Sequence, residues 1–210
     1  MNDTKNATFR YVDDPHGYWL GPEELPSPSK VFTDLGLVNA RFFTEESRLR
    51  GRAVHAGLHF ALKGTLDWNT LHPDLHGYVK SGLRLVDRLG PTIIRAETPL
   101  YHPTLRFAGT SDQEWELKGW RYIIDFKSGK APAVTRYQTA AYELLSRVNL
   151  NPIQRYKRAA VELQEDGSIA NMVKYEDHTD GAGWLNLLGA YRIRQDLRQT
   201  RELATIETGE

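Results

Sequence analysis

Between Thr92 and Lys127 the hydrophobic residues of the chain recur with the period of strands rather than that of helices. The segments "TIIRAETPL" and "TLRFAGTSD" are rich in β-branched and aromatic residues. The segments "QEWEL" and "WRYIIDFK" follow on either side of Lys118 and Gly119, which form a turn signal. This pattern predicts a β-meander of three or four strands, against which the rest of the chain must pack.

The segments on both sides of the meander favour helices. Their hydrophobic spacing places these helices over residues 29–37, 45–62, 74–89, 134–148 and 179–203. Thr44 is a suitable N-cap for the second of them, and residues 153–164 and 169–175 predict a second hairpin. This order of elements predicts a single α/β (α+β) domain with a central mixed β-sheet flanked by helices.

The first 28 residues contain four prolines, Pro15, Pro22, Pro26 and Pro28, and predict an irregular arm outside the core. No apolar run reaches the length of a membrane span, and no signal peptide is recognisable, so we expect a cytoplasmic protein without a membrane partner.

The composition excludes several classes of site. The 210 residues include no cysteine, which rules out disulfides, thiolate nucleophiles, iron–sulfur clusters and Cys-ligated zinc. Lys and Arg number 27, as do Asp and Glu, so the formal net charge is zero. Any surface that binds a polyanion must therefore be local.

Charged residues inside the meander are the strongest sign of chemistry. Asp125 and Lys127 share one face of their strand, about 7 Å apart along it, and Asp112 follows the small residues Ala108 and Thr110 on the preceding strand. Buried charges are costly unless they are paired or bound to a metal. Two aspartates on adjacent strands are suited to Mg²⁺, which prefers carboxylate oxygens and keeps positions for water and phosphate.

Each of these residues also has a purely structural interpretation. The pattern Asp-x-Lys occurs by chance in many proteins, and Asp112 alone could close a turn. His55 alone is compatible with a core or surface histidine, and Gln138 and Tyr142, four residues apart, with an amphipathic helix.

Five motifs occur together and in a fixed order: "RGRAVH", "AETPL", "GTSD", "IIDFKSGK" and "YQTAAY". Over about residues 48–145 this order resembles the RecB-like branch of the PD-(D/E)XK nuclease superfamily, which includes phage-type exonucleases. The segment "LPSPSKVFTDLGL" also resembles the lead-in segment of small phage-type members. The resemblance implies an N-terminal arm with this lead-in segment over residues 1–43 and a nuclease domain over residues 44–210, within one domain overall.

The resemblance also implies roles for individual residues. Asp112 and Asp125 would be catalytic metal ligands, joined by His55 and by the main-chain carbonyl of Phe126. Lys127 would be the catalytic lysine. The ion would be Mg²⁺ or Mn²⁺, in one or two copies, and the imidazole favours manganese somewhat more than an all-oxygen site would.

Further groups would complete the catalytic and DNA-binding surfaces. Glu97 resembles the acid on the preceding strand, in the outer shell or at a second metal, while Gln138 and Tyr142 would touch the DNA backbone. Arg52 and Lys130 lie next to the motifs and are candidates for phosphate contacts. The aromatic candidates for stacking on unpaired bases, each also compatible with core packing, are Tyr101, Trp115 and Trp120.

These expectations describe a metal-dependent exonuclease that hydrolyses DNA from double-stranded ends or as single strands, in DNA recombination, DNA repair or phage DNA processing. A single-strand annealing or recombination partner and a homo-oligomer are compatible with them. Two alternatives stay open: a structure-specific or sequence-specific endonuclease of the same superfamily, and a non-catalytic protein that binds DNA or a partner on a nuclease fold.

Overall fold

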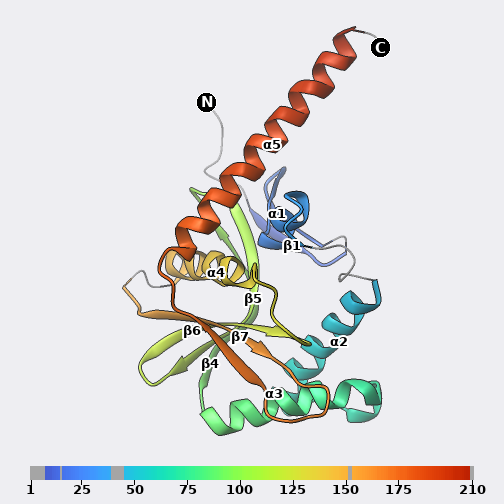
Figure 1. Ribbon diagram of the computed structural model, residues 1–210, viewed down its shortest axis with the longest axis vertical. Coiled ribbons are helices and arrows are strands. Elements are labelled where there is room, and N and C mark those ends of the chain that lie inside the picture. The colour runs from blue at the N-terminus through green and yellow to red at the C-terminus, as the bar shows by residue number, and fades with distance from the viewer. Residues whose placement is uncertain (1–7, 15, 39–44, 151–152, 209–210) are drawn as a thin grey trace.

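The computed structural model describes residues 8–14, 16–38, 45–150 and 153–208. They form a single α/β domain in which a five-stranded sheet lies between two layers of helices (Figure 1). The strand order is that of the sequence: β4 (Thr92–His102), β5 (Phe107–Leu117), β6 (Trp120–Lys127), β7 (Tyr156–Glu162) and β8 (Asn171–Tyr175). β6 and β7 are parallel and the other neighbours are antiparallel, so the predicted mixed sheet flanked by helices is confirmed.

The helices divide between the two faces of the sheet. α2 (Glu45–Leu62) and α3 (His76–Leu89) cover one face, and short 3₁₀ turns at Trp68–Thr70 and Pro73–Leu75 join them. The other face is covered by α4 (Thr135–Asn149), by α1 (Pro28–Asp34) and by the first part of α5 (Asp180–Thr208). The far half of α5 extends away from the domain (Figure 1).

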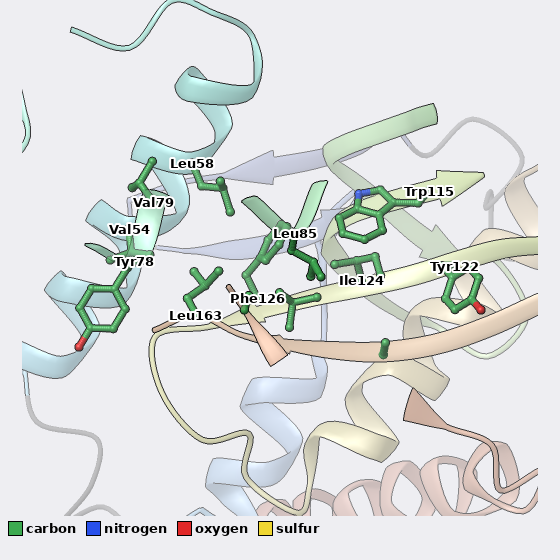
Figure 2. Close-up of a cluster of buried hydrophobic side chains, with 13 residues drawn as sticks. Val54, Leu58, Tyr78, Val79, Leu85, Trp115, Tyr122, Ile124, Phe126 and Leu163 are labelled. Atoms are coloured by element: carbon green, nitrogen blue, oxygen red, sulfur yellow. The ribbon is translucent and has the colours of Figure 1, made fainter. Parts of the chain in front are cut away.

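Neighbouring residues of β6 show why one sheet holds two cores. Side chains alternate along a strand, so Ile124 packs towards Val54 of α2 and Val79 of α3 (Figure 2). Ile123, one residue earlier, packs instead in the layer of α4 and α5, beside Trp184. The three aliphatic residues Ile123, Val54 and Val79 have no solvent exposure, and the strands that carry the charged motifs are thereby held from both sides.

Local signals set the ends of several elements. α1 begins after Ser27, whose Oγ accepts from the N–H of Lys30, and α3 ends at Gly90, which adopts φ 59°. β5 and β6 are joined by Lys118 and Gly119, both with positive φ, as a tight hairpin turn requires. The two strand segments predicted before this turn are one continuous strand, β5. The last helix runs on to Thr208, and Thr44 lies outside the described residues.

The prediction of an irregular N-terminal arm was wrong for the described part of residues 1–28. This part forms a three-stranded antiparallel sheet of β1 (Phe9–Val12), β2 (Gly17–Leu20) and β3 (Glu23–Leu25). Its inner side chains Tyr18, Leu20 and Leu25 are buried with Ala108 of β5. The sheet is fixed to β5 by a main-chain hydrogen bond from Ala108 N–H to the Pro26 carbonyl (3.1 Å).

Among the described residues, the helices include none with the length and apolar character needed to span a bilayer.

Candidate active site

The site begins where two strands of the meander separate. The pairing of β5 with β6 ends at Gln113 and Ile124, whereas β5 continues to pair with β4, and β6 with β7. Beyond that point the main-chain N–H of Phe126 donates to Oδ2 of Asp112 at 2.5 Å. The Asp112 carboxylate, which is 9 % exposed, thus lies in the fork between the strands.

His55 approaches this carboxylate from the helical layer of α2 and α3. It lies on α2, and its Nδ1 is 3.3 Å from Oδ1 of Asp112. Burial by itself would lower the pKa of His55, but the charge and hydrogen bond of Asp112, together with the charge of Asp125, outweigh burial and raise the pKa to about 9. Burial would likewise raise the pKa of Asp112, but His55, the charge of Lys127 and the Phe126 N–H together outweigh burial and lower it.

Glu97 completes a group of possible metal ligands. In the pairing of β4 with β5, Ala96 faces Gln113 and Thr98 faces Ser111, which places Glu97 opposite Asp112. Its φ of 49° is left-handed, an uncommon conformation for a residue with a side chain. Partial desolvation, together with the neighbouring charge of Asp112, raises the pKa of Glu97 to about 7. Among the described residues, one ligand atom each from His55, Glu97 and Asp112 lie within 4.8 Å of one another.

Asp125 and Lys127 form the second half of the site. The Lys127 Nζ is 2.6 Å from Oδ2 of Asp125 and donates to Oε1 of Gln138 on α4 at 3.2 Å. Gln138 Nε2 in turn donates to the Tyr142 hydroxyl at 3.0 Å. Gly109 of β5 makes room for this chain of contacts, because a Cβ there would lie 2.8 Å from the Tyr142 ring.

The ionic states of this pair depend on each other. Asp125 is 2 % exposed, and burial raises its pKa, aided by the charge of Asp112 and opposed by that of Lys127. Burial alone would lower the pKa of Lys127, but Asp125 and Asp112 together raise it above its usual value. Lys127 is therefore held as an ammonium beside Asp125.

The ligand group fits a divalent cation. Two carboxylates and one imidazole are a donor set suited to Mg²⁺ or Mn²⁺. Glu97 and Asp112 bring like charges together, which adds to the effect of burial in raising the pKa of Glu97, and Glu97 does so from a strained backbone. A cation between them would relieve the repulsion. The carboxylate of Glu97 lies beside Asp112 and His55, and its place in the outer shell or at a second ion stays a prediction.

The other predicted ligands take different positions. Asp125 contacts Lys127 through its Oδ2, and the ring of Phe126 is buried in the core beside Trp115, while its N–H binds Asp112. Ligation of a cation by Asp125 and by the Phe126 carbonyl stays a prediction.

The predicted phosphate contacts are on the surface. The side chain of Arg52 is 67 % exposed, three residues before His55 on α2, and 3.9 Å from Glu45. The side chain of Lys130 is 88 % exposed, and its Nζ is 3.1 Å from Glu162. Both residues keep their charge accessible to a polyanion.

The three aromatic residues predicted to stack on bases all pack against other parts of the protein. Trp115 is fully buried and lies out of reach of a nucleobase. Tyr101 stacks on Phe9 with ring centroids 4.7 Å apart, and Trp120 has the Lys157 ammonium 4.4 Å from its ring.

The aromatic residues of the β1–β2 hairpin were not among the residues predicted for the site. The Tyr18 hydroxyl is 2.9 Å from Thr110 Oγ1, two residues before Asp112, which brings this hairpin next to the site. The alternation in "FRYV" and "GYWL" on either side of Asp13 and Asp14 is the hairpin signal that would have pointed to it.

Comparison with known proteins gives little guidance. No family model matches the chain, and no curated protein matches it. A solved structure of LHK-Exo in complex with dAMP is similar, with a TM-score of 0.39 and 14% sequence identity over 88% of this chain and 93% of that one. The similarity is weak, so the function has to be inferred from the geometry of the chain's own site.

Proposed function

We propose that this protein is a divalent-metal-dependent DNA nuclease that hydrolyses phosphodiester bonds from DNA ends. The observation that carries the proposal is the group formed by His55, Glu97 and Asp112, whose ligand atoms lie within 4.8 Å of one another beside the Asp125–Lys127 pair. Carboxylates and an imidazole at one fork of a sheet can hold a divalent cation, and the ammonium beside them can act on a phosphate, which together suits phosphodiester hydrolysis.

His55, Glu97 and Asp112 would hold the cation, with Asp125 and the Phe126 carbonyl as further ligands. A bound Mg²⁺ or Mn²⁺ supplies a water of lowered pKa and neutralises charge on the phosphate. The chain's own contribution is orientation: the Phe126 N–H fixes Asp112 in the fork, and α2 brings His55 to its free oxygen.

Lys127 would act on the phosphate. Its ammonium stays charged because Asp125 and Asp112 raise its pKa. It donates to Gln138, which in turn donates to the Tyr142 hydroxyl. From there it would donate to a non-bridging phosphate oxygen or hold the attacking water. Gln138 and Tyr142 would contact the sugar–phosphate backbone next to the scissile bond.

Dependence on a DNA end is supported by the kind of contacts around the site and by its covering. Arg52 and Lys130 are suited to backbone phosphates, which position DNA without reading its sequence. The β1–β3 sheet is fixed on β5 at Ala108 and Thr110, shortly before Asp112, where it would narrow the approach of DNA to the site. We further propose a role in DNA recombination, DNA repair or phage DNA processing, where ends are resected.

The test is an assay of the same DNA in linear and covalently closed circular form, with Mg²⁺, with Mn²⁺ and with EDTA. We expect linear DNA to be shortened progressively in either metal, the circle to stay intact, and EDTA to stop the reaction. The Asp112→Asn variant is the matched control for a contaminating nuclease. Fragments from the circle, formed as fast as products from linear DNA, would instead identify an endonuclease. Binding of DNA without cleavage in either metal would identify a non-catalytic protein.

A further inference from the structure

The β1–β2 hairpin presents aromatic rings beside the candidate active site. Tyr11 and His16 lie with their ring centroids 5.4 Å apart, and each also packs on Tyr18, at 5.3 and 5.4 Å respectively. Tyr18 is 3 % exposed, whereas Tyr11 is 39 % exposed and His16 is also exposed. The buried ring thus supports two rings that face solvent. We call Tyr11 and His16 on this support the aromatic platform.

The register of the strands places the platform. Phe9 stacks on Tyr101 of β4, and Tyr18, paired with Tyr11 in the hairpin, bonds to Thr110. Thr110 pairs with Pro99, so the hairpin advances along β4 from Tyr101 towards Glu97. Asp112 lies two residues, or about 7 Å, beyond Thr110 on its strand. The platform therefore borders the ligand group, and the negative charge of Glu97 is accordingly among the causes that raise the pKa of Tyr18, after burial.

Hydrogen bonds fix the orientation of the exposed ring. The Tyr11 hydroxyl donates to Oδ1 of Asp13 at 2.9 Å and lies 3.3 Å from Nδ1 of His16. An exposed tyrosine normally samples several rotamers, and one held at its hydroxyl has lost that freedom before a ligand arrives. Such a preorganised aromatic surface binds a flat ligand at a lower entropic cost.

We propose that Tyr11 and His16 form a stacking site for an unpaired nucleobase, next to the phosphate that a cation at His55, Glu97 and Asp112 would bind. The proposal rests on the function proposed above and narrows its substrate to DNA ends with unpaired nucleotides, either single strands or frayed duplex ends. A nucleobase is the ligand favoured here because every base has a π-face and is covalently linked, through its sugar, to the phosphate that the neighbouring cation would bind.

Binding without cleavage is the first test. A fluorescein-labelled oligodeoxythymidine is titrated in Ca²⁺ and followed by anisotropy. Since stacking contributes substantially to single-strand affinity, we expect Tyr11→Ala to raise Kd about ten-fold, and Tyr11→Phe, which keeps the ring, to stay within about two-fold of wild type. Leu197→Ala is the control, because it removes an exposed apolar side chain from the second half of α5, and it should leave Kd unchanged. Equal Kd values for wild type and Tyr11→Ala would overturn the proposal.

A direct contact test covers the case in which Tyr11→Ala fails to fold. Single 5-iododeoxyuridines are placed at successive terminal positions of the oligonucleotide, irradiated on wild-type protein, and the crosslinked peptide is identified by mass spectrometry. We expect crosslinks to Tyr11 or His16 from one or two terminal positions. Crosslinks confined to other aromatics, such as Tyr101 or Trp120, would overturn the proposal.

The two proposals fail separately. Crosslinking to Tyr11 without cleavage in Mg²⁺ or Mn²⁺ leaves the platform standing and contradicts the nuclease function. Cleavage by wild type together with unchanged affinity and unchanged KM in Tyr11→Ala contradicts the platform and leaves the nuclease function standing.

Discussion

The main-chain N–H of Phe126 donates to the side-chain carboxylate of Asp112, so a charged group of β5 occupies the position beside β6 where the strand ladder has ended. The carboxylate is thereby oriented by a neighbouring backbone rather than by its own rotamer preference. Its second oxygen is left to face His55. Asp112 therefore tolerates little change. Its two roles, accepting from the Phe126 N–H and attracting a cation, can be separated by substitution.

Asp112→Asn should remove metal binding and leave the fold intact. The amide oxygen still accepts from the Phe126 N–H, but the charge that attracts a cation is gone. We expect wild-type protein to gain thermal stability with increasing Mn²⁺, since a ligand of the folded state alone stabilises it, and Asp112→Asn to gain almost none. Its rate of DNA cleavage should fall at least about 100-fold, as is common for loss of a metal ligand or its support. Asp112→Ala should additionally melt at a lower temperature, because the buried N–H loses its acceptor. An undiminished Mn²⁺ effect in Asp112→Asn would refute the ligand group.

Lys127→Met should lose both activity and stability. Its ammonium is paired with a buried carboxylate at 2.6 Å. Its removal leaves Asp125 buried without a cation, which costs on the order of 2–3 kcal/mol of unfolding free energy, less than for a fully enclosed pair. The double variant Asp125→Asn/Lys127→Met removes both charges and should recover most of that stability without recovering cleavage. Urea unfolding and rates per folded molecule distinguish the two effects, and cleavage at the wild-type rate by Lys127→Met would exclude the proposed role.

Replacement of Glu97 should stabilise the protein and abolish its activity at the same time. A left-handed backbone costs a residue with a side chain about 1 kcal/mol, so Glu97→Gly should raise the free energy of unfolding by a similar amount, reduced by the greater entropy of glycine in the unfolded chain. Both this variant and Glu97→Gln should lose metal-dependent stabilisation and cleavage. A drop in stability for Glu97→Gly would show that the strain is absent.

The charge of Glu97 gives a second, pH-dependent readout. Its folded pKa is raised from 4.5 to about 7, so between these values the folded protein holds a proton that the unfolded chain has lost. Stability from this group is therefore present at low pH and decreases as pH rises towards 7. Without metal, Glu97→Gln should lack this decrease and be more stable than wild type at pH 8, as thermal melts from pH 4 to 8 will show. A difference in melting temperature between Glu97→Gln and wild type that is the same at every pH would contradict this expectation.

Asp177 should stabilise the protein only above the acid range. It accepts from the N–H and Oγ1 of Thr179 and pairs with Arg136, and the hydrogen bonds of Thr179, with those of Arg136, lower its pKa to about 2. A depressed folded pKa means that its contribution is complete above the unfolded value near 4 and disappears as pH falls towards 2. Asp177→Asn should therefore melt below wild type at pH 5–7, and the difference should vanish near pH 2. A constant difference across this range would contradict the assigned cause.

The meander and the charged motifs were predictable because their signals are local. Strand alternation fixed the common side of Asp125 and Lys127, and the turn at Lys118 and Gly119 fixed which strands are neighbours. The contact between Lys127 and Gln138 could not be predicted in this way, because it depends on how α4 packs across the sheet.

The N-terminal sheet was missed because its prolines were taken as breaks rather than as borders. Pro22 lies in the turn between β2 and β3, Pro26 follows β3, and Pro28 is the first residue of α1. Each is a position where a missing N–H costs little. The roles of the aromatics were unpredictable for another reason: Trp115 is buried and Tyr11 exposed according to which layer covers each face, and that is a tertiary property.

The possible ligands come from two layers of the fold, the sheet and the helix α2, and this sets the order in which the site can be assembled during folding. Glu97 and Asp112 lie on neighbouring strands of one meander, whose local contacts form early and quickly. His55 belongs to α2, and its helix must dock on the finished sheet before it reaches Asp112. We therefore expect the two carboxylates to be in place before His55 reaches them. Binding of the ion would then be a late step in folding, and the bound ion would stabilise the packing of α2 on the sheet. In amide exchange, α2 should accordingly be the element whose protection rises most when metal is added.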